Sequence, residues 1–248
     1  MRSITVAMPA YNEAENIEAM VADVIQVMDP LTDDYEVIVV DDGSGDGTGQ
    51  VVKSLTRQYP QVRLVSHEVN QGYGAAVFSG LTSASKELVF FTDSDRQFDL
   101  REIEKLLAHI DKADLVVGYR APRRDPVMRK LNGWGWSALV TLLFGYTARD
   151  IDCAFKLMRR QVIQTIRDKV KSRGATFSAE FLVRAKRAGF RVCEVPIHGH
   201  RPRVAGSPTG ARPDVIIRAF KELIRFRIAL WREGMMTWGY EGTRRTGE

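Results

Sequence analysis

The chain has 248 residues, of which 44% are hydrophobic and 27% are charged, and its formal net charge is +5. This balance excludes a disordered chain and a disulfide-stabilised small domain, because apolar residues suffice for a sizeable core and only two cysteines occur. The positive charge favours an anionic partner, and no apolar run reaches the ~18–20 residues of a membrane-spanning helix.

Residues 1–118 alternate between short apolar runs and amphipathic segments. The apolar runs predict strands at 3–8, 37–40, 62–65, 88–92 and 115–118. The segments between them predict helices from residue 12 or 13, at about 48–58, after Gly74, and at about 99–110. Repeated strand–helix units of this kind predict an α/β fold, a doubly wound, mostly parallel sheet with helices on both faces.

The pattern changes after Gly118, where a basic segment with two prolines begins. Further helices are predicted at about 127–144, 159–170 and 177–188. A short strand is predicted at 191–195, and the stretch 198–213, rich in arginine, proline and glycine, is predicted to be a loop or lid. The last predicted helix covers 214–232.

The segment 214–232 has two distinct faces on a helical wheel. Its apolar face consists of Ile217, Phe220, Ile224, Ile228 and Trp231. An adjacent basic stripe consists of Arg218, Lys221, Arg225 and Arg232. Two alternatives remain open: the apolar face docks on the core of the domain, or it lies in a membrane interface with the basic residues on anionic headgroups.

Two carboxylates, Asp93 and Asp95, follow the predicted strand 88–92 and are separated by one residue. In an open parallel sheet, ligands bind outside the carboxyl ends of the strands. Two acids at such a place suit a hard divalent cation whose coordination shell is completed by a phosphorylated ligand. The alternative is ordinary turn chemistry, in which these residues cap a helix.

A second acidic turn, residues 41–48, follows the predicted strand 37–40. A dinucleotide-binding fingerprint requires a third glycine that is missing, because the sixth position is Thr48 counted from Gly43 and Gln50 counted from Gly45. Acidic residues at this strand end suit a ribose hydroxyl or a base amide better than a pyrophosphate. The glycines are equally compatible with a purely structural turn.

The loop 198–213 contains two histidines, His198 and His200, which make a poor metal site because no carboxylate accompanies them in the segment. The nearby arginines are better candidates, as residues that bind anions. They are Arg191, Arg201, Arg203 and Arg212.

Seven motifs occur in order along most of the chain. They are Met8 to Glu13, Val40 to Ser44, Asn70 to Ala75, Asp93 to Gln97, Gly118 to Arg120, Asp150 to Lys156, and Arg203 to Ser207. Together they resemble the inverting family 2 glycosyltransferases of the GT-A fold. Within that family the chain is similar to the polyprenyl-phosphate hexose transferases, the type that includes dolichyl-phosphate mannose synthase.

The resemblance implies roles for residues in the first half of the chain. The residues that would contact the donor nucleotide are Pro9, Tyr11, Glu13 and Asp42. Asp95 and Gln97 would hold a divalent cation, Mg²⁺ or Mn²⁺, with Asp93 as a third metal-site residue that lies toward the ribose or the sugar.

In the second half, the resemblance implies that three arginines would bind the donor and acceptor phosphates. They are Arg120, Arg129 and Arg203. If a catalytic base or an orienting carboxylate exists, Asp150 or Asp152 is the candidate. Many relatives have Ser-Gly-Phe-Arg in place of Cys153 to Lys156, which leaves the sugar pocket undefined.

The implied function is transfer of a hexose, mannose or glucose, from a nucleotide diphosphate sugar to a polyprenyl monophosphate. Two alternatives remain: a family 2 transferase with a soluble or saccharide acceptor, and a non-catalytic nucleotide-sugar or membrane-surface binding protein. No nucleic-acid partner is expected. We expect a cytoplasmic protein because only two cysteines occur, and a peripheral one on the inner face of the cell membrane because no apolar run is long enough to span it. Many relatives carry C-terminal transmembrane helices that are missing from this sequence, so the C-terminal helix and the lid are the expected membrane contacts.

The expected organisation is one catalytic domain at 1–211, followed by a basic amphipathic helix and tail at 212–248. Within the domain, 1–118 would bind the nucleotide, and 119–211 would bind the acceptor and supply the lid. This division follows the change of pattern after Gly118.

Overall fold

A computed structural model of the chain describes residues 2–122, 127–201 and 213–234, without the side chains of 127–132 and 213–217. Its centre is a seven-stranded sheet with the order β3-β2-β1-β4-β6-β5-β7. The strands are β1 (Ile4–Ala10), β2 (Tyr35–Asp41), β3 (Val62–Ser66), β4 (Leu88–Thr92), β5 (Leu115–Arg120), β6 (Phe155–Arg159) and β7 (Val192–Ile197). Every residue of β1 and β4 is buried, as expected for central strands covered on both faces.

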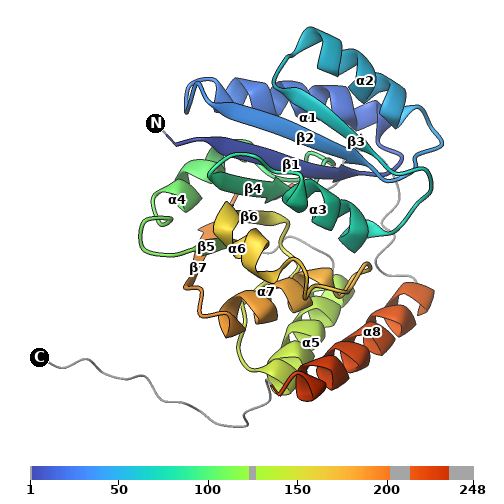
Figure 1. Ribbon diagram of the computed structural model, residues 1–248, viewed down its shortest axis with the longest axis vertical. Coiled ribbons are helices and arrows are strands. Elements are labelled where there is room, and N and C mark those ends of the chain that lie inside the picture. Colours follow the sequence, from blue (N-terminus) through green and yellow to red (C-terminus); the bar gives the residue numbers. More distant parts are fainter. Residues whose placement is uncertain (1, 123–126, 202–212, 235–248) are drawn as a thin grey trace, which may run out of the picture.

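Helices lie on both faces of the sheet (Figure 1). They are α1 (Ala14–Met28), α2 (Thr48–Gln58), α3 (Tyr73–Thr82), the 3-10 turn η1 (Leu100–Glu102), α4 (Ile103–Leu107), α5 (Val127–Phe144), α6 (Arg160–Ile166), α7 (Phe177–Arg187) and α8 (Pro213–Arg232). Side chains of α1, α2 and α4 form one core with the sheet, and side chains of α3, α6 and α7 form another. The predicted doubly wound α/β architecture is confirmed.

Most predicted boundaries lie within a few residues of the observed ones, and α2, β4 and α5 match. The predicted helix at 99–110 is instead a 3-10 turn followed by the short helix α4. The carboxylate of Asp99 explains where this segment begins, because it accepts a hydrogen bond from the backbone N–H of Arg101 at 3.2 Å.

The sequence did not predict β6, which runs antiparallel to both of its neighbours, β4 and β5. The buried Lys156 interrupts its apolar run, so the period of the pattern gives no clear strand signal. The other neighbouring strands pair in parallel. Because β6 is reversed, the segment before it, with Asp150 and Asp152, reaches the edge where the parallel strands end.

Helix α8 docks on the protein through a face that the helical wheel did not single out. The residues that it buries are Ala219, Leu223, Phe226 and Leu230. The apolar face identified from the sequence is exposed at Phe220, Ile224, Ile228 and Trp231. Of the two alternatives, the one in which this face packs on the core is therefore excluded, and Phe226 and Leu230 form a cluster with Val183 of α7 instead.

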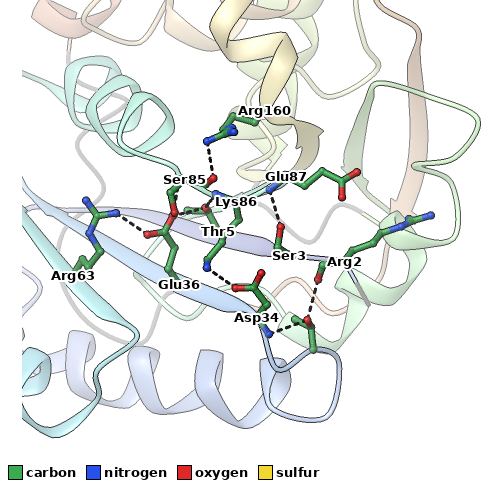
Figure 2. A network of polar contacts seen from close by, with 11 residues as sticks. Arg2, Ser3, Thr5, Asp34, Glu36, Arg63, Ser85, Lys86, Glu87 and Arg160 are labelled. Carbon is green, nitrogen blue, oxygen red and sulfur yellow. Dashed lines mark hydrogen bonds and ion pairs between the residues drawn. The ribbon is translucent and has the colours of Figure 1, made fainter.

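At the opposite edge of the sheet, where the parallel strands begin, a polar network joins β1, β2, β3 and the segment that precedes β4 (Figure 2). Glu36, which is paired in register with Thr5, lies at its centre. Its Oε1 accepts hydrogen bonds from Thr5 Oγ1 at 2.7 Å and from the backbone N–H of Ser85 at 2.7 Å. Its Oε2 accepts one from Arg63 at 2.6 Å. Burial alone raises the pKa of Glu36, but these donors outweigh it and lower the pKa to about 2.

We expect Glu36→Gln to lower the free energy of unfolding by about 2–3 kcal/mol at pH 7, because the ionised carboxylate is what the network stabilises. The folded-state pKa is depressed from 4.5, so this contribution is complete above pH 4.5 and is lost as the pH falls toward 2. Urea unfolding of both proteins at pH 7 and at pH 3 measures it. A deficit of the same size at both pH values would contradict the assignment.

Candidate active site

The turn that follows β1 is fastened to the acidic turn that follows β2. The backbone N–H of Asn12 donates to Ser44 Oγ at 2.9 Å, and that of Gly45 donates back to Asn12 Oδ1 at 3.0 Å. The backbone N–H of Glu13 donates to Thr48 Oγ1 at 2.9 Å. Asn12 adopts a φ of 54°, a left-handed conformation that asparagine tolerates better than most residues. The two strand ends therefore form one surface.

The four predicted donor-nucleotide residues lie on or next to this surface but differ in accessibility. The ring of Tyr11 is 47% exposed, whereas Glu13 and Asp42 are buried. Glu13 accepts a hydrogen bond from the side-chain amide of Asn16 at 2.7 Å. The carbonyl of Pro9 accepts one from Ser94 Oγ at 2.8 Å, which joins the end of β1 to the segment after β4.

Asp42 organises the loop between β3 and α3. Its Oδ1 accepts hydrogen bonds from His67 Nδ1 at 2.6 Å and from the backbone N–H of Gln71 at 2.9 Å, and its Oδ2 accepts one from the N–H of Gly72 at 2.9 Å. His67 Nε2 lies 2.9 Å from Ser79 Oγ. His67 was missed by the sequence analysis because it lies outside the recognised motifs. It holds the carboxylate of Asp42 in place.

The paired carboxylates after β4 lie at the carboxyl edge of the sheet. Asp93 Oδ1 accepts a hydrogen bond from the Tyr73 hydroxyl at 3.0 Å, and Asp95 Oδ1 accepts one from the backbone N–H of Gln97 at 3.2 Å. Gln97 donates its side-chain amide to the carbonyl of Arg201 at 3.1 Å, which leaves the amide oxygen for another partner. Tyr73 belongs to a recognised motif, yet no role for it was predicted.

Asp93 is half-buried and lies next to the buried Asp95. Burial and the neighbouring Asp95 carboxylate raise the pKa of Asp93 above its usual value, although Tyr73, Lys156 and Arg120 oppose the shift. A bound cation would relieve the repulsion between these two carboxylates. The oxygen donors present suit a hard divalent ion, so the residues fit the predicted Mg²⁺ or Mn²⁺.

Lys156, from β6, places a buried amine on the same site. Burial lowers the pKa of Lys156, while Cys153, Asp152, Asp150 and Asp93 act in the opposite direction. Its ammonium group donates to the carbonyl of Cys153 and lies 5.6 Å from the centre of the Phe91 ring. Lys156, which stands where many relatives have arginine, therefore lies close to the predicted metal residue Asp93.

The predicted phosphate-binding residue Arg120 forms a bidentate ion pair with the predicted base Asp150. Arg120 Nε and a terminal nitrogen donate to the two carboxylate oxygens of Asp150 at 2.7 and 2.8 Å. Both side chains are almost buried, with 12% and 9% of their surface exposed. Asp152 is exposed, and it acts electrostatically on both Lys156 and Tyr73. Arg120, Asp150, Asp152 and Lys156 therefore lie close enough to Asp93 or to one another to interact electrostatically.

Other sequence predictions fare differently. Arg191 is not at the site: it precedes β7, at the edge where parallel strands begin, and its backbone N–H donates to Asp114 at 2.8 Å, so its prediction as an anion-binding residue is wrong. His198 lies 3.1 Å from the amine of Lys105, and His200 packs on the Phe98 ring. Three predicted residues lie outside what the structure describes: Arg203 and Arg212 entirely, and Arg129 in its side chain.

Among the described residues, no group of three or more histidine, cysteine, aspartate or glutamate side chains is arranged to hold a metal ion. Asp93 and Asp95 supply two carboxylates, with the side-chain oxygen of Gln97 nearby. Mg²⁺ is commonly bound in this way, through one or two carboxylates together with substrate phosphates. The arrangement suits a ligand that brings its own phosphate oxygens.

Known proteins resemble this chain in sequence. A family model described as glycosyl transferase family 2 matches residues 5–167. A dolichyl-phosphate beta-glucosyltransferase from Trichomonas vaginalis is 30% identical over 92% of this chain and 72% of its own length. The dolichyl-phosphate beta-glucosyltransferase of Saccharomyces cerevisiae is 28% identical over 91% of this chain and 74% of its own length.

Solved structures share the fold. Glucosyl-3-phosphoglycerate synthase from Mycobacterium tuberculosis, in complex with Mg²⁺ and uridine diphosphate, superimposes with a TM-score of 0.67 at 22% identity. The match covers 96% of this chain and 82% of that chain. The same enzyme has been solved with Mn²⁺ and uridine-diphosphate-glucose, with a TM-score of 0.64. The predicted GT-A architecture is confirmed.

Proposed function

The chain belongs to glycosyl transferase family 2, and on that premise we propose that it transfers glucose from a nucleotide diphosphate sugar to a polyprenyl monophosphate. The sequence left mannose and glucose open. Two relatives that align over most of their length are named dolichyl-phosphate beta-glucosyltransferases, which favours glucose and a lipid-phosphate acceptor.

One observation carries the proposal: paired carboxylates and a fixed guanidinium face the same small region. Asp93 and Asp95 lie after β4, and Arg120, fixed by its ion pair with Asp150, is close enough to oppose the rise in the pKa of Asp93. A donor with a diphosphate needs a cation, and a phosphate acceptor needs positive charge that brings two anions together. We propose that this combination serves both requirements.

We propose that Asp95, Asp93 and the side-chain oxygen of Gln97 hold Mg²⁺ or Mn²⁺. When bound, the ion would supply positive charge to the diphosphate leaving group. Tyr73 keeps Asp93 oriented through its hydrogen bond. Structures of the mycobacterial synthase contain either ion with uridine diphosphate, which supports a divalent cation without choosing between them.

The nucleotide would lie on the surface built from the turns after β1 and β2. Tyr11, half exposed, is suited to stacking on a base, and Pro9 and Glu13 shape the adjoining turn. We propose that Asp42 keeps the loop at 70–72 in position and that its carboxylate faces the nucleotide. His67 supports Asp42 in this role.

The acceptor phosphate requires no strong base, because its second pKa is about 6 and it is largely dianionic at pH 7. Both carboxylate oxygens of Asp150 accept hydrogen bonds from Arg120. Asp150 is therefore better suited to orienting Arg120 than to removing a proton. We propose that Arg120, with Arg129 and Arg203, binds phosphates, and that Asp152 orients the sugar or acceptor. Attack opposite to the leaving group would invert the anomeric centre.

A polyprenyl phosphate resides in a membrane, so the proposed reaction takes place at a membrane surface. We propose a protein peripheral to the cytoplasmic face, in contact with the lipid acceptor. The division into a nucleotide half at 1–118 and an acceptor half at 119–211 follows the same assignment.

The decisive experiment is incubation of the protein and Mn²⁺ with a panel of nucleotide sugars and a short polyprenyl phosphate, followed by mass analysis of the product. We expect a glucosylated lipid phosphate, and no product with the matching polyprenol that lacks the phosphate. A mannosylated product would overturn the choice of sugar. Transfer to a saccharide alone would overturn the choice of acceptor.

A further inference from the structure

Helix α8 carries three separate stripes along its described length. At about 100° per residue, its buried residues occupy one sector, an exposed apolar stripe the next, and a basic stripe the third. The exposed apolar residues are Trp231 (65% exposed), Ile224 (57%), Phe220 (46%) and Ile228 (44%). Four large apolar side chains on one stripe mark an interaction surface rather than a scatter of single exposed residues.

The apolar stripe extends onto the neighbouring helix α5, which lies beside α8 (Figure 1). The rings of Phe220 and Trp136 meet edge to face with centroids 6.3 Å apart. Helix α5 also exposes Trp134 (72%) and Leu142 (79%). The two helices together form the end of the molecule farthest from α2 (Figure 1).

The basic stripe borders the apolar one. Its four members, Arg218, Lys221, Arg225 and Arg232, are all exposed. Among the described side chains of α8, the acidic Glu222 is half-buried, and Glu233, just after the helix, pairs with Arg184. The exposed charge next to the apolar stripe is therefore positive, which is complementary to anionic lipid headgroups.

Helix α8 is also held in place by contacts outside the exposed stripe. Arg184 of α7 donates to Glu180 at 2.7 Å and to both oxygens of Glu233 at 3.1 and 3.2 Å. On the buried side, the rings of Phe144 and Phe226 stack with centroids 4.8 Å apart. These contacts fix the helix, so its outer face is presented as a rigid surface.

The same helix is connected to the active site by a short path. Thr176 Oγ1 donates to the carbonyl of Ala219 in α8 at 3.0 Å. Three residues earlier, the carbonyl of Arg173 accepts from the N–H of Ala75 in α3 at 3.0 Å. Helix α3 begins with Tyr73, which donates to Asp93. The turn between α6 and α7 therefore joins the exposed surface to the predicted metal residues.

We propose that α8 and the adjoining side of α5 dock on the surface of a bilayer that contains anionic lipid. The apolar stripe enters the boundary between headgroups and acyl chains, and the basic stripe contacts lipid phosphates. Among the described residues, no helix is long and apolar enough to cross a membrane. Docking would bring the site to the membrane that holds the acceptor, a consequence that rests on the proposed function.

Flotation with lipid vesicles tests the docking. We expect the protein to bind vesicles of equal parts phosphatidylcholine and phosphatidylglycerol, and to bind phosphatidylcholine alone much more weakly. Ile224→Gln with Ile228→Gln should weaken binding to the mixed vesicles about tenfold or more. Lys221→Glu with Arg225→Glu should do the same, because each basic residue near an anionic surface contributes.

The matched control is Lys53→Glu with Arg57→Glu on α2, which makes the same change of charge at the other end of the molecule and should bind like wild type. Circular dichroism and thermal unfolding confirm that each variant is folded. The proposal is overturned if the wild-type protein does not bind anionic vesicles, or if the Ile224→Gln, Ile228→Gln variant binds them like wild type. It is also overturned if the wild-type protein is a dimer, the Gln variant is a monomer and neither binds vesicles, because the stripe then contacts a second copy of the chain.

Activity separates this proposal from the proposed function. The Ile224→Gln, Ile228→Gln variant should keep wild-type activity on a short, water-soluble isoprenyl phosphate and lose it on a long acceptor in vesicles. Vesicle binding without transfer to either acceptor would count against the proposed function alone. Transfer to the soluble acceptor without vesicle binding would count against docking alone.

Discussion

Replacing Asp95 with asparagine is expected to lower kcat/KM for sugar transfer by on the order of a thousandfold. The substitution keeps an oxygen that can accept from the N–H of Gln97, so the turn after β4 should retain its shape. It removes the negative charge on which the proposed cation depends. Binding of Mn²⁺, followed by electron paramagnetic resonance, should weaken together with the activity.

The matched control is Asp99→Asn, a few residues further along. Asp99 caps η1 by accepting a hydrogen bond from the backbone N–H of Arg101. Its replacement by asparagine removes the same charge from the same segment, but at a residue outside the proposed metal site. This control should keep Mn²⁺ binding close to that of wild type. If Asp95→Asn retained both activity and Mn²⁺ affinity, the metal assignment would be refuted.

The second large effect is expected at Arg120. Arg120→Ala leaves the almost buried Asp150 carboxylate without its bidentate partner, so the free energy of unfolding should fall by about 3–5 kcal/mol. If Arg120 also binds phosphate, kcat/KM should fall by on the order of a thousandfold. Urea unfolding and steady-state kinetics on the same samples measure the two losses.

A second substitution separates these roles. Adding Asp150→Asn to Arg120→Ala removes the carboxylate that lost its bidentate partner and should recover stability without recovering activity. Arg120→Lys keeps the charge but loses the planar fork, so its activity should lie between those of wild type and Arg120→Ala. Recovery of full activity in the double variant would contradict a phosphate-binding role.

The reversed strand β6 shows where prediction from the sequence ended. The strands β1, β2 and β4 were predicted because continuous apolar runs mark strands buried on both faces. β6 contains Lys156, and its antiparallel direction depends on pairing with β4 and β5, more than thirty residues away in the sequence. Without β6, nothing in the sequence explains how Asp150 reaches the site.

The candidate site was predicted unevenly for the same reason. The position of Asp93 and Asp95 at the end of a buried strand is a local property, and the sequence located it. That Tyr73 holds Asp93, that His67 holds Asp42, and that Arg120 is paired with Asp150 are contacts between distant segments. Sequence patterns over a few neighbouring residues do not predict contacts between distant segments.

By itself, the sequence determined the α/β architecture and the place of the acidic turn after β4, because apolar periodicity is a property of neighbouring residues, and its motifs, taken in order, indicated the family. Only the tertiary structure decided which face of α8 is buried. The wheel showed one large apolar face, yet the smaller set from Ala219 to Leu230 fits the surface of α7 and α5. Which face of a helix is buried depends on the shape and charge of the protein surface beneath it, here with Arg184 and Phe144. The apolar periodicity of the helix itself contains no information about that surface.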